Sequence, residues 1–209
     1  MAKRTALLII DVQYDFLEGG SLATNDANAV IPIINEIRNK VHFDDVVVSK
    51  DWHPKGHCSF ASSHPGKALF EDITLPDGTP QKLWPDHCVQ GSHGAEVHSD
   101  LKLEPTDFVV FKGQHAEIDS YSAFFDNAHK AKTTLQDHLQ SKAITDVIVV
   151  GIALDYCVCF TAMDAKDLGY TTTVVEDACR GVAPESTAAA VENMKKKGIN
   201  LIKAETLLG

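Results

Sequence analysis

The stretch TALLIID, residues 5–11, sets the fold class, because it is apolar from Ala6 to Ile10 and then ends on a carboxylate. A strand with one face in water alternates apolar and polar residues, whereas a strand buried on both faces is apolar throughout. These features predict a buried strand. Similar short runs, rich in β-branched residues, recur at residues 45–50, 107–112, 146–152, 171–176 and 199–203.

Helical periodicity fills several intervals between these runs. Apolar residues from Val30 to Val41 recur at spacings of three and four, and a looser pattern covers residues 189–194. Alternating strands and helices predict one α/β domain over residues 1–209, with three α/β/α layers around a mainly parallel six-stranded sheet. Right-handed crossovers place the carboxyl ends of the strands along one edge, where ligands usually bind.

Composition excludes several classes of partner. A formal charge of -10 and a pI of 5.4 disfavour binding to a phosphate backbone, so we expect no nucleic-acid partner. No apolar run approaches the roughly 18 residues that span a bilayer, and no secretory signal opens the chain. Five cysteines are an odd number for a disulfide framework. We therefore expect a cytoplasmic protein with reduced thiols and no membrane contact.

One stretch breaks the alternation of strands and helices. Residues 53–106 carry little periodicity, many Pro and Gly residues, and six of the ten histidines. Loops of this length are uncommon unless they are disordered or carry a site, and Trp84 with scattered apolar positions argues against disorder. We expect a functional loop region at about 51–106.

Predicted strand ends present three residues that could perform chemistry: Asp11, Lys112 and Cys157. Taken singly, each has an ordinary interpretation as a helix cap, a solvated ammonium or a small buried hydrophobe. Cys157 differs because it opens a predicted helix, residues 156–168, with Asp155 as a plausible cap, and a helix N-terminus stabilises a thiolate. A cysteine attacks an amide when a base takes its proton and a cation or dipole stabilises the developing charge, and Asp11 and Lys112 are residues of those types.

A second group follows the second predicted strand. Asp51 and His53 lie at its end, His57 is four residues further, and His87 belongs to the segment WPDHC, residues 84–88. A carboxylate with two or three histidines suits zinc, iron or manganese, with positions left open for water or substrate. Alternatively, such residues only form hydrogen bonds, and we prefer that interpretation for four other histidines: His64, His93, His98 and His115.

Five separated blocks occur in order and together cover nearly the whole chain. They are ALLIIDVQYDFLEGGSL from residue 6, VVVSKDWHPKGHCSF from residue 46, LWPDHCVQGSHGAEVH from residue 83, VVFKGQ from residue 109 and VVGIALDYCV from residue 149. Together they resemble the nicotinamidase branch of the isochorismatase-like cysteine hydrolases. The resemblance implies the isochorismatase-like hydrolase fold.

The same resemblance implies roles for individual residues. Asp11, Lys112 and Cys157 would form a catalytic triad. A cis peptide bond before Ala153 would turn the backbone N–H groups of Ala153 and Cys157 into an oxyanion hole. Phe16 and Trp84 would flank the substrate ring, and Tyr121 would lie near the same pocket, although all three could otherwise be ordinary packing residues.

The resemblance also assigns one divalent metal ion to Asp51, His53 and His87, with waters completing the coordination. Zinc is the first expectation, with iron or manganese as alternatives. His57 is a ligand in some relatives and lies outside the coordination sphere in others. The metal would bind the pyridine nitrogen of the substrate and could lower the pKa of a bound water.

The implied activity is metal-dependent hydrolysis of nicotinamide to nicotinate and ammonia through a thioester on Cys157, feeding NAD salvage. Asp11 would take the thiol proton and return it to the leaving amine, while Lys112 keeps Asp11 oriented. Pyrazinamide is expected as a second substrate. Nicotinamide is the expected small-molecule partner, and a homo-oligomer is left open.

Two alternatives stay open at this point. The first is another enzyme of the same superfamily, an isochorismatase or an N-carbamoyl amide hydrolase, which metal content would distinguish. The second is a non-catalytic metal- or ligand-binding protein in which Cys157 is structural. Rapid alkylation by iodoacetamide at neutral pH would argue against it, because a buried structural thiol stays inert.

Overall fold

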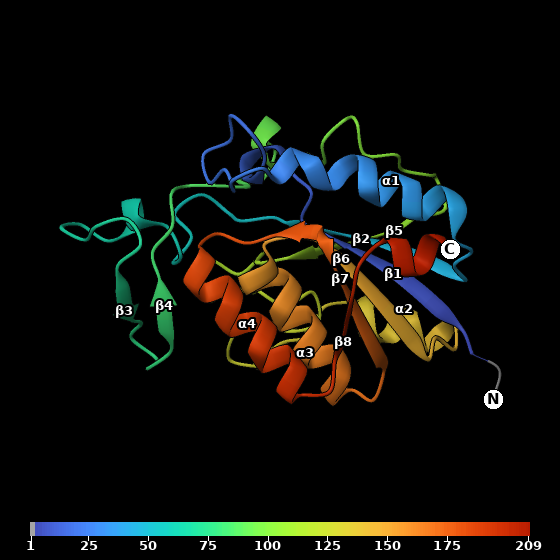
Figure 1. Cartoon of the computed structure of the whole chain (residues 1–209). Coiled ribbons are helices and arrows are strands. Elements are labelled where there is room, and N and C mark those ends of the chain that lie inside the picture. The colour runs from blue at the N-terminus through green and yellow to red at the C-terminus, as the bar shows by residue number, and fades with distance from the viewer. Residues whose placement is uncertain (1–2) are drawn as a thin grey trace.

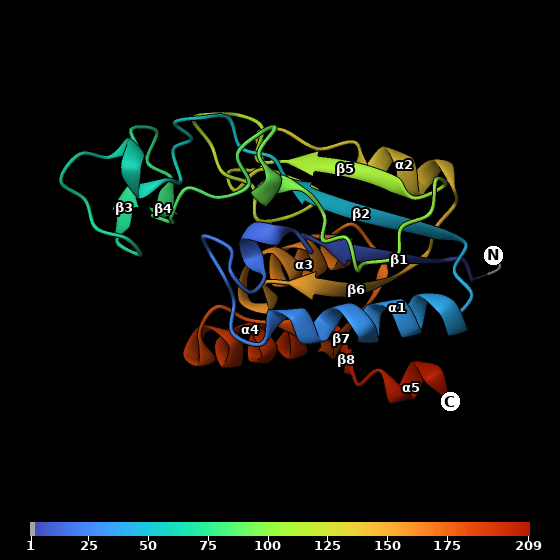
Figure 2. The same cartoon turned by 90° about the horizontal axis from the view of Figure 1, so that it is seen from above.

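A six-stranded sheet forms the centre of the computed structural model, which describes residues 3–209. All neighbouring strands are parallel, in the order β5-β2-β1-β6-β7-β8 (Figure 2). This confirms the predicted parallel sheet. The strands are β1 (Thr5–Ile10), β2 (Asp45–Asp51), β5 (Phe108–Lys112), β6 (Asp146–Ile152), β7 (Thr171–Arg180) and β8 (Asn200–Ile202).

Helices cover both faces of this sheet (Figure 1). Alternate side chains of β1 divide between two cores: Leu8 packs with α2 (Leu135–Ser141), α3 (Cys159–Asp167) and α4 (Pro184–Lys196), whereas Leu7 packs with α1 (Val30–Lys40) and α5 (Glu205–Leu208). Every side chain from Ala6 to Ile10 is at most 1% exposed, which explains why this run carries no polar residue. None of the helices within residues 3–209 has the length and apolar character needed to cross a bilayer.

Some elements differ from the sequence prediction. β7 continues to Arg180, four residues beyond the predicted end, and its pairing with β6 shifts register between Val149 and Gly151. Glu176 and Asp177 interrupt the apolar run and conceal this continuation. α2 was not predicted either, because its buried face consists only of Leu135 and Leu139.

The predicted loop region contains a small hairpin. Strands β3 (Asp72–Thr74) and β4 (Pro80–Lys82) pair antiparallel and project away from the sheet (Figures 1 and 2). Three-residue strands are too short for a periodic signal, so the sequence predicted only a loop. Phe60, Leu83 and Trp84 are nevertheless buried, and they anchor the loop region to the body of the protein.

Gly151 on β6 permits the close approach of β1. Its φ is +117°, and a Cβ there would lie 2.1 Å from the carbonyl oxygen of Ile10. Backbone on a central strand cannot move aside, so we expect Gly151→Ala to lower the free energy of unfolding by at least about 2 kcal/mol. Urea denaturation would measure the loss.

Gly169→Ala is the matched control. Gly169 also has a positive φ, +92°, but no atom lies within 4 Å of an added Cβ. Its replacement should therefore cost only the backbone preference, about 1 kcal/mol. Equal losses for the two variants would show that the contact with Ile10 is unimportant.

Candidate active site

The candidate site lies at the carboxyl ends of three neighbouring strands. Asp11 directly follows β1, Asp51 ends β2, and Lys112 ends β5. Asp51 and Lys112 face each other in the strand register, so they reach the sheet edge at the same level. Cys157 lies in the turn that follows β6, the other neighbour of β1.

Lys112 is the central charge of this group. Its Nζ lies 2.9 Å from Asp11 Oδ2, 3.0 Å from Asp51 Oδ1 and 3.4 Å from Cys157 Sγ, and it donates to the carbonyl oxygen of Ser120 at 3.0 Å. The ordinary interpretation of a solvated lysine is wrong here, because the side chain is fully buried. Burial alone would lower the pKa of Lys112, but Asp11 and Asp51 outweigh it and hold that pKa well above its ordinary value.

Asp11 is held by two partners. Ser49 Oγ donates to Asp11 Oδ1 at 2.6 Å and accepts from the Asp11 N–H at 3.2 Å, while Oδ2 faces Lys112. Burial raises the pKa of Asp11, and the attraction of Lys112 and the hydrogen bond from Ser49 offset part of the rise. Sequence reasoning missed Ser49. The sequence offers only a weak signal for it, a hydroxyl that directly follows three valines.

Cys157 is buried, and its surroundings favour the neutral thiol. Burial raises its pKa well above the ordinary value, Lys112 lowers it, and Asp11 raises it further. Burial thus opposes the stabilised thiolate that the sequence predicts at this position. Forming the thiolate here requires a base that accepts the proton, and Asp11 shares Lys112 with the thiol.

The turn that carries Cys157 differs from the predicted helix. It is a π-helical turn, Leu154–Val158, in which the carbonyl oxygen of Ala153 accepts from Val158 N. Asp155 is not its cap; instead its carboxylate accepts from the N–H groups of Val182 and Ala183 ahead of α4. The peptide bond between Ile152 and Ala153 is cis, as the resemblance implied.

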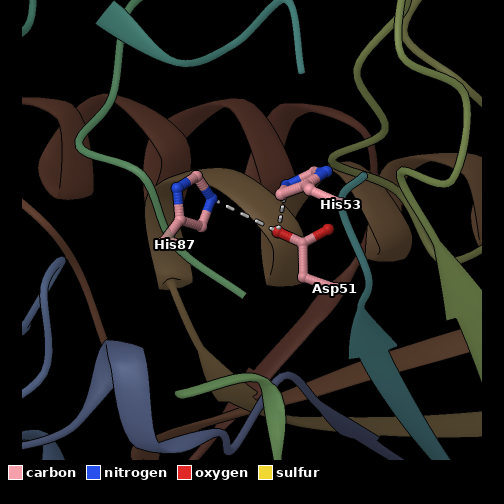
Figure 3. Close-up of side chains that lie close together, drawn as sticks. All are labelled: Asp51, His53 and His87. Atoms are coloured by element: carbon pink, nitrogen blue, oxygen red, sulfur yellow. Dashed lines mark ion pairs between the residues drawn. The ribbon is translucent and has the colours of Figure 1, made fainter. Parts of the chain in front are cut away.

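Asp51, His53 and His87 form a group that could bind a metal ion, since one potential ligand atom from each lies within 4.8 Å of the others. Figure 3 shows both imidazole rings beside the Asp51 carboxylate; their Nε2 atoms lie 3.1 and 3.6 Å from its Oδ2. The Nδ1 atoms face the carbonyl oxygens of Gly113 and Pro85 at 2.8 and 2.7 Å. Carbonyls only accept, so the neutral form of either ring would carry its proton on Nδ1 and turn the Nε2 lone pair towards Asp51.

This donor set fits a divalent metal. His53 Nε2 is buried without a hydrogen-bond partner, as expected of an atom that coordinates an ion, and the Nδ1 contacts are of the kind that orient metal-binding histidines. Gly113 makes room for the ring, because a Cβ there would lie 2.4 Å from His53 Cε1. Burial opposes ionisation of Asp51, yet His53 and Lys112 hold its pKa well below the ordinary value.

Gln13 fixes the backbone beneath this group. Its side-chain amide donates to the Asp51 carbonyl oxygen and accepts from the Asp51 N–H, both at 2.8 Å, and it also donates to the Ala95 carbonyl oxygen. The side chain is fully buried. Gln13 therefore joins the end of β2 to the loop region.

His57 is not a member of the group that Asp51, His53 and His87 form. Its ring stacks on His53 at 4.0 Å, its Nδ1 contacts Ser59 Oγ at 2.7 Å, and its Nε2 contacts the Ile118 carbonyl oxygen at 3.3 Å. Both ring nitrogens thus have partners. Burial, together with His53, lowers the pKa of His57 to about 4. A second possible metal group combines His57 with His53 and Asp119.

Hydrogen bonding accounts for two of the other loop histidines, as predicted. His64 Nε2 contacts the Cys58 carbonyl oxygen at 2.7 Å, and His98 Nδ1 accepts from Asp100 N at 3.2 Å.

A small pocket opens beside Cys157. It brings together the nucleophile candidate, two members of the metal group and the three predicted aromatic residues. Sequence reasoning missed Tyr156, whose ring packs perpendicular to that of Trp84 at 4.8 Å. The full lining is Phe16, Leu22, Asp51, Trp84, His87, Asp119, Tyr121, Ala153, Tyr156, Cys157 and Val182.

Residues 5–206 match the model of the isochorismatase domain. The chain belongs to this family. It is 44% identical to a nicotinamidase of Escherichia coli in an alignment 200 residues long, and the match covers 94% of this chain and 93% of that protein. A nicotinamidase/pyrazinamidase structure from Acinetobacter baumannii is 46% identical and superposes with a TM-score of 0.94 over the whole of both chains.

A pyrazinamidase from Pyrococcus horikoshii, solved in complex with zinc, is also similar to this isochorismatase-family protein. It is 31% identical, the TM-score is 0.78, and the match covers 96% of this chain and 99% of that one. The family and the fold implied by the sequence blocks are thus confirmed.

Replacing histidines separately would distinguish the two possible metal groups. We expect His87→Ala to weaken zinc binding by more than about tenfold, because a ligand is lost, and His57→Ala to change it by less than about threefold. Competition with a chromophoric chelator measures both affinities, and circular dichroism checks that each variant folds. A larger loss for His57→Ala would instead favour the group that contains Asp119.

Proposed function

We propose that this protein hydrolyses nicotinamide to nicotinate and ammonia, as an amidohydrolase with a cysteine nucleophile. The observation that carries the proposal is the position of Lys112, whose buried ammonium contacts both Asp11 and Cys157, and Cys157 lines the pocket. Relatives named nicotinamidases, which match along nearly the whole chain, support the substrate.

The pocket suits a small, flat, uncharged ring. Phe16, Trp84 and Tyr121 supply aromatic surface, and their side chains are at least half-buried. Asp51, His53 and His87 would hold one divalent ion, which we propose to be zinc, and the ion would supply a Lewis acid for a nitrogen donor of the substrate and for water. The zinc complex of the related pyrazinamidase supports that choice. Pyrazinamide has the same size and an equivalent carboxamide, so we propose it as a second substrate.

In the first half of the reaction Asp11 accepts the thiol proton, and Cys157 Sγ attacks the carboxamide carbon. Lys112 stabilises the thiolate from 3.4 Å. We assign the backbone N–H groups of Ala153 and Cys157 to the negative charge that develops on the substrate oxygen. The C–N bond then breaks, Asp11 returns its proton to the leaving nitrogen, ammonia departs, and a thioester remains.

In the second half a water molecule attacks the thioester carbonyl. Asp11 is again a carboxylate at this stage and accepts a proton from the water. The C–S bond breaks, and the proton returns to the sulfur of Cys157. The acid product loses its remaining proton to solvent water and leaves as nicotinate, and the thiol is restored for the next cycle.

Ammonia release from nicotinamide by the zinc-loaded protein tests the proposal. We expect Cys157→Ala to abolish release, and benzamide, which lacks the ring nitrogen, to react at least about tenfold more slowly because it cannot bind the Lewis acid. A folded, zinc-loaded sample that releases no ammonia from nicotinamide would overturn the proposed function.

Ser49→Ala should change the pH dependence of this activity. The hydrogen bond from Ser49 favours the ionised form of Asp11, so its loss raises the pKa of Asp11 further. The base must be ionised to accept the thiol proton. We therefore expect the acid limb of the kcat/KM profile to move to higher pH by roughly half to one unit, so that the loss of activity is largest at low pH.

Thr172→Val is the control for removing a buried hydroxyl. Thr172 is fully buried near the start of β7, where its Oγ1 contacts the Tyr170 carbonyl oxygen. This variant should leave the pH profile unchanged, and Ser49→Thr, which restores a hydroxyl, should return it towards the original. If the acid limb of the Ser49→Ala profile does not move, Ser49 is only a packing residue.

A further inference from the structure

Asp119 is a third carboxylate in the pocket. It lies between β5 and α2, is 3% exposed, and lines the same cavity as Asp51 and Cys157. Its Oδ1 accepts from the Ser120 N–H at 2.8 Å, and its Oδ2 accepts from Gln81 Nε2 at 3.1 Å. Both donors are uncharged.

The partners of Asp119 differ from those of the other two carboxylates. Asp11 and Asp51 share the ammonium of Lys112. Within residues 3–209, the ion pairs below 4.0 Å do not include Asp119. The nearby imidazoles of His53 and His57 do not pair with it, because His53 Nε2 faces Asp51 and both ring nitrogens of His57 contact other oxygen atoms.

Charge balance in the site depends on Asp119. The carboxylates of Asp11, Asp51 and Asp119 and the ammonium of Lys112 leave a net charge of two negatives. A divalent ion cancels that charge, so the loaded site is neutral overall. A neutral site accepts an uncharged carboxamide, and it offers no net attraction to a carboxylate.

We propose that Asp119 is a specificity-determining residue that disfavours anionic ligands, so that the pocket binds the neutral amide and releases the carboxylate product. This inference rests on the proposed function, in which hydrolysis converts a neutral carboxamide into a carboxylate. Charges inside a pocket are screened less than charges in water, so one negative charge in the pocket lining raises the free energy of a bound anion. An amide of the same shape does not carry this penalty.

A purely structural role for Asp119 gives a different expectation. Its carboxylate also ties Gln81 at the base of the hairpin to the body of the protein. If that were its whole role, replacement would weaken the amide and the acid alike. The ratio of the two affinities therefore separates charge from structure.

Asp119→Asn is the decisive variant. It removes the charge and keeps the size, and Gln81 Oε1, which is buried without a partner, can accept from the new amide after the Gln81 side chain rotates. We expect nicotinate to bind about tenfold tighter, both as a product inhibitor and by calorimetry on the zinc-loaded protein, while the KM for nicotinamide changes less than about threefold.

Asp164→Asn is the matched control, because Asp164 is a buried carboxylate outside the pocket, 3.5 Å from His129. It should leave the affinity ratio of nicotinate to nicotinamide unchanged. If Asp119→Asn does not fold, Asp119→Ser removes the same charge and retains an acceptor for the Ser120 N–H.

An unchanged affinity ratio in a folded Asp119 variant overturns the inference, and so does an equal change in Asp164→Asn. Calorimetry on Cys157→Ala measures the affinities for nicotinamide and for nicotinate without turnover. A protein that binds both ligands but releases no ammonia would therefore refute the proposed function without deciding the role of Asp119.

Discussion

The buried ammonium of Lys112 is the interaction on which the site depends. Removing a cation from water costs several kcal/mol, and only close, well-oriented carboxylates offset that cost. Lys112 has two of them, Asp11 and Asp51, at about 3 Å. One carboxylate belongs to the proposed acid–base pair and the other to the proposed metal group. The two halves of the site are therefore electrostatically coupled, and neither can lose its charge without disturbing the other.

Sheet topology brings these charges together. β1 lies between β2 and β6, and β5 pairs with β2, so four chain segments end within reach of one another. Glycine is required at two of the contacts: Gly151 lets β6 approach β1, and Gly113 makes room for the ring of His53. Parallel strands bring their carboxyl ends to the same edge of the sheet. The two glycines, which have no side chain, leave the space that the neighbouring atoms need.

The sequence predicts this framework well because its signals are local. A buried strand is a short apolar run, and Asp11 and Lys112 stand where such runs stop. Ser49 and Asp119 leave no comparable signal. A serine in a strand and an aspartate in a loop are ordinary, and only the fold shows that one contacts Asp11 and the other lines the pocket. Asp155 was misassigned for the same reason, since its partners, Val182 and Ala183, are distant in sequence.

Burial also determines how the nucleophile can be used. A cysteine with a depressed pKa is a thiolate at rest and reacts with any electrophile that reaches it. Cys157 has the opposite bias, because its buried environment favours the neutral thiol. The proton can move only to a base already in place, and Asp11 is held ready by Ser49 and Lys112. Cys157 thus becomes nucleophilic through proton transfer to Asp11 within the site. A substrate must fill the pocket to be attacked by it.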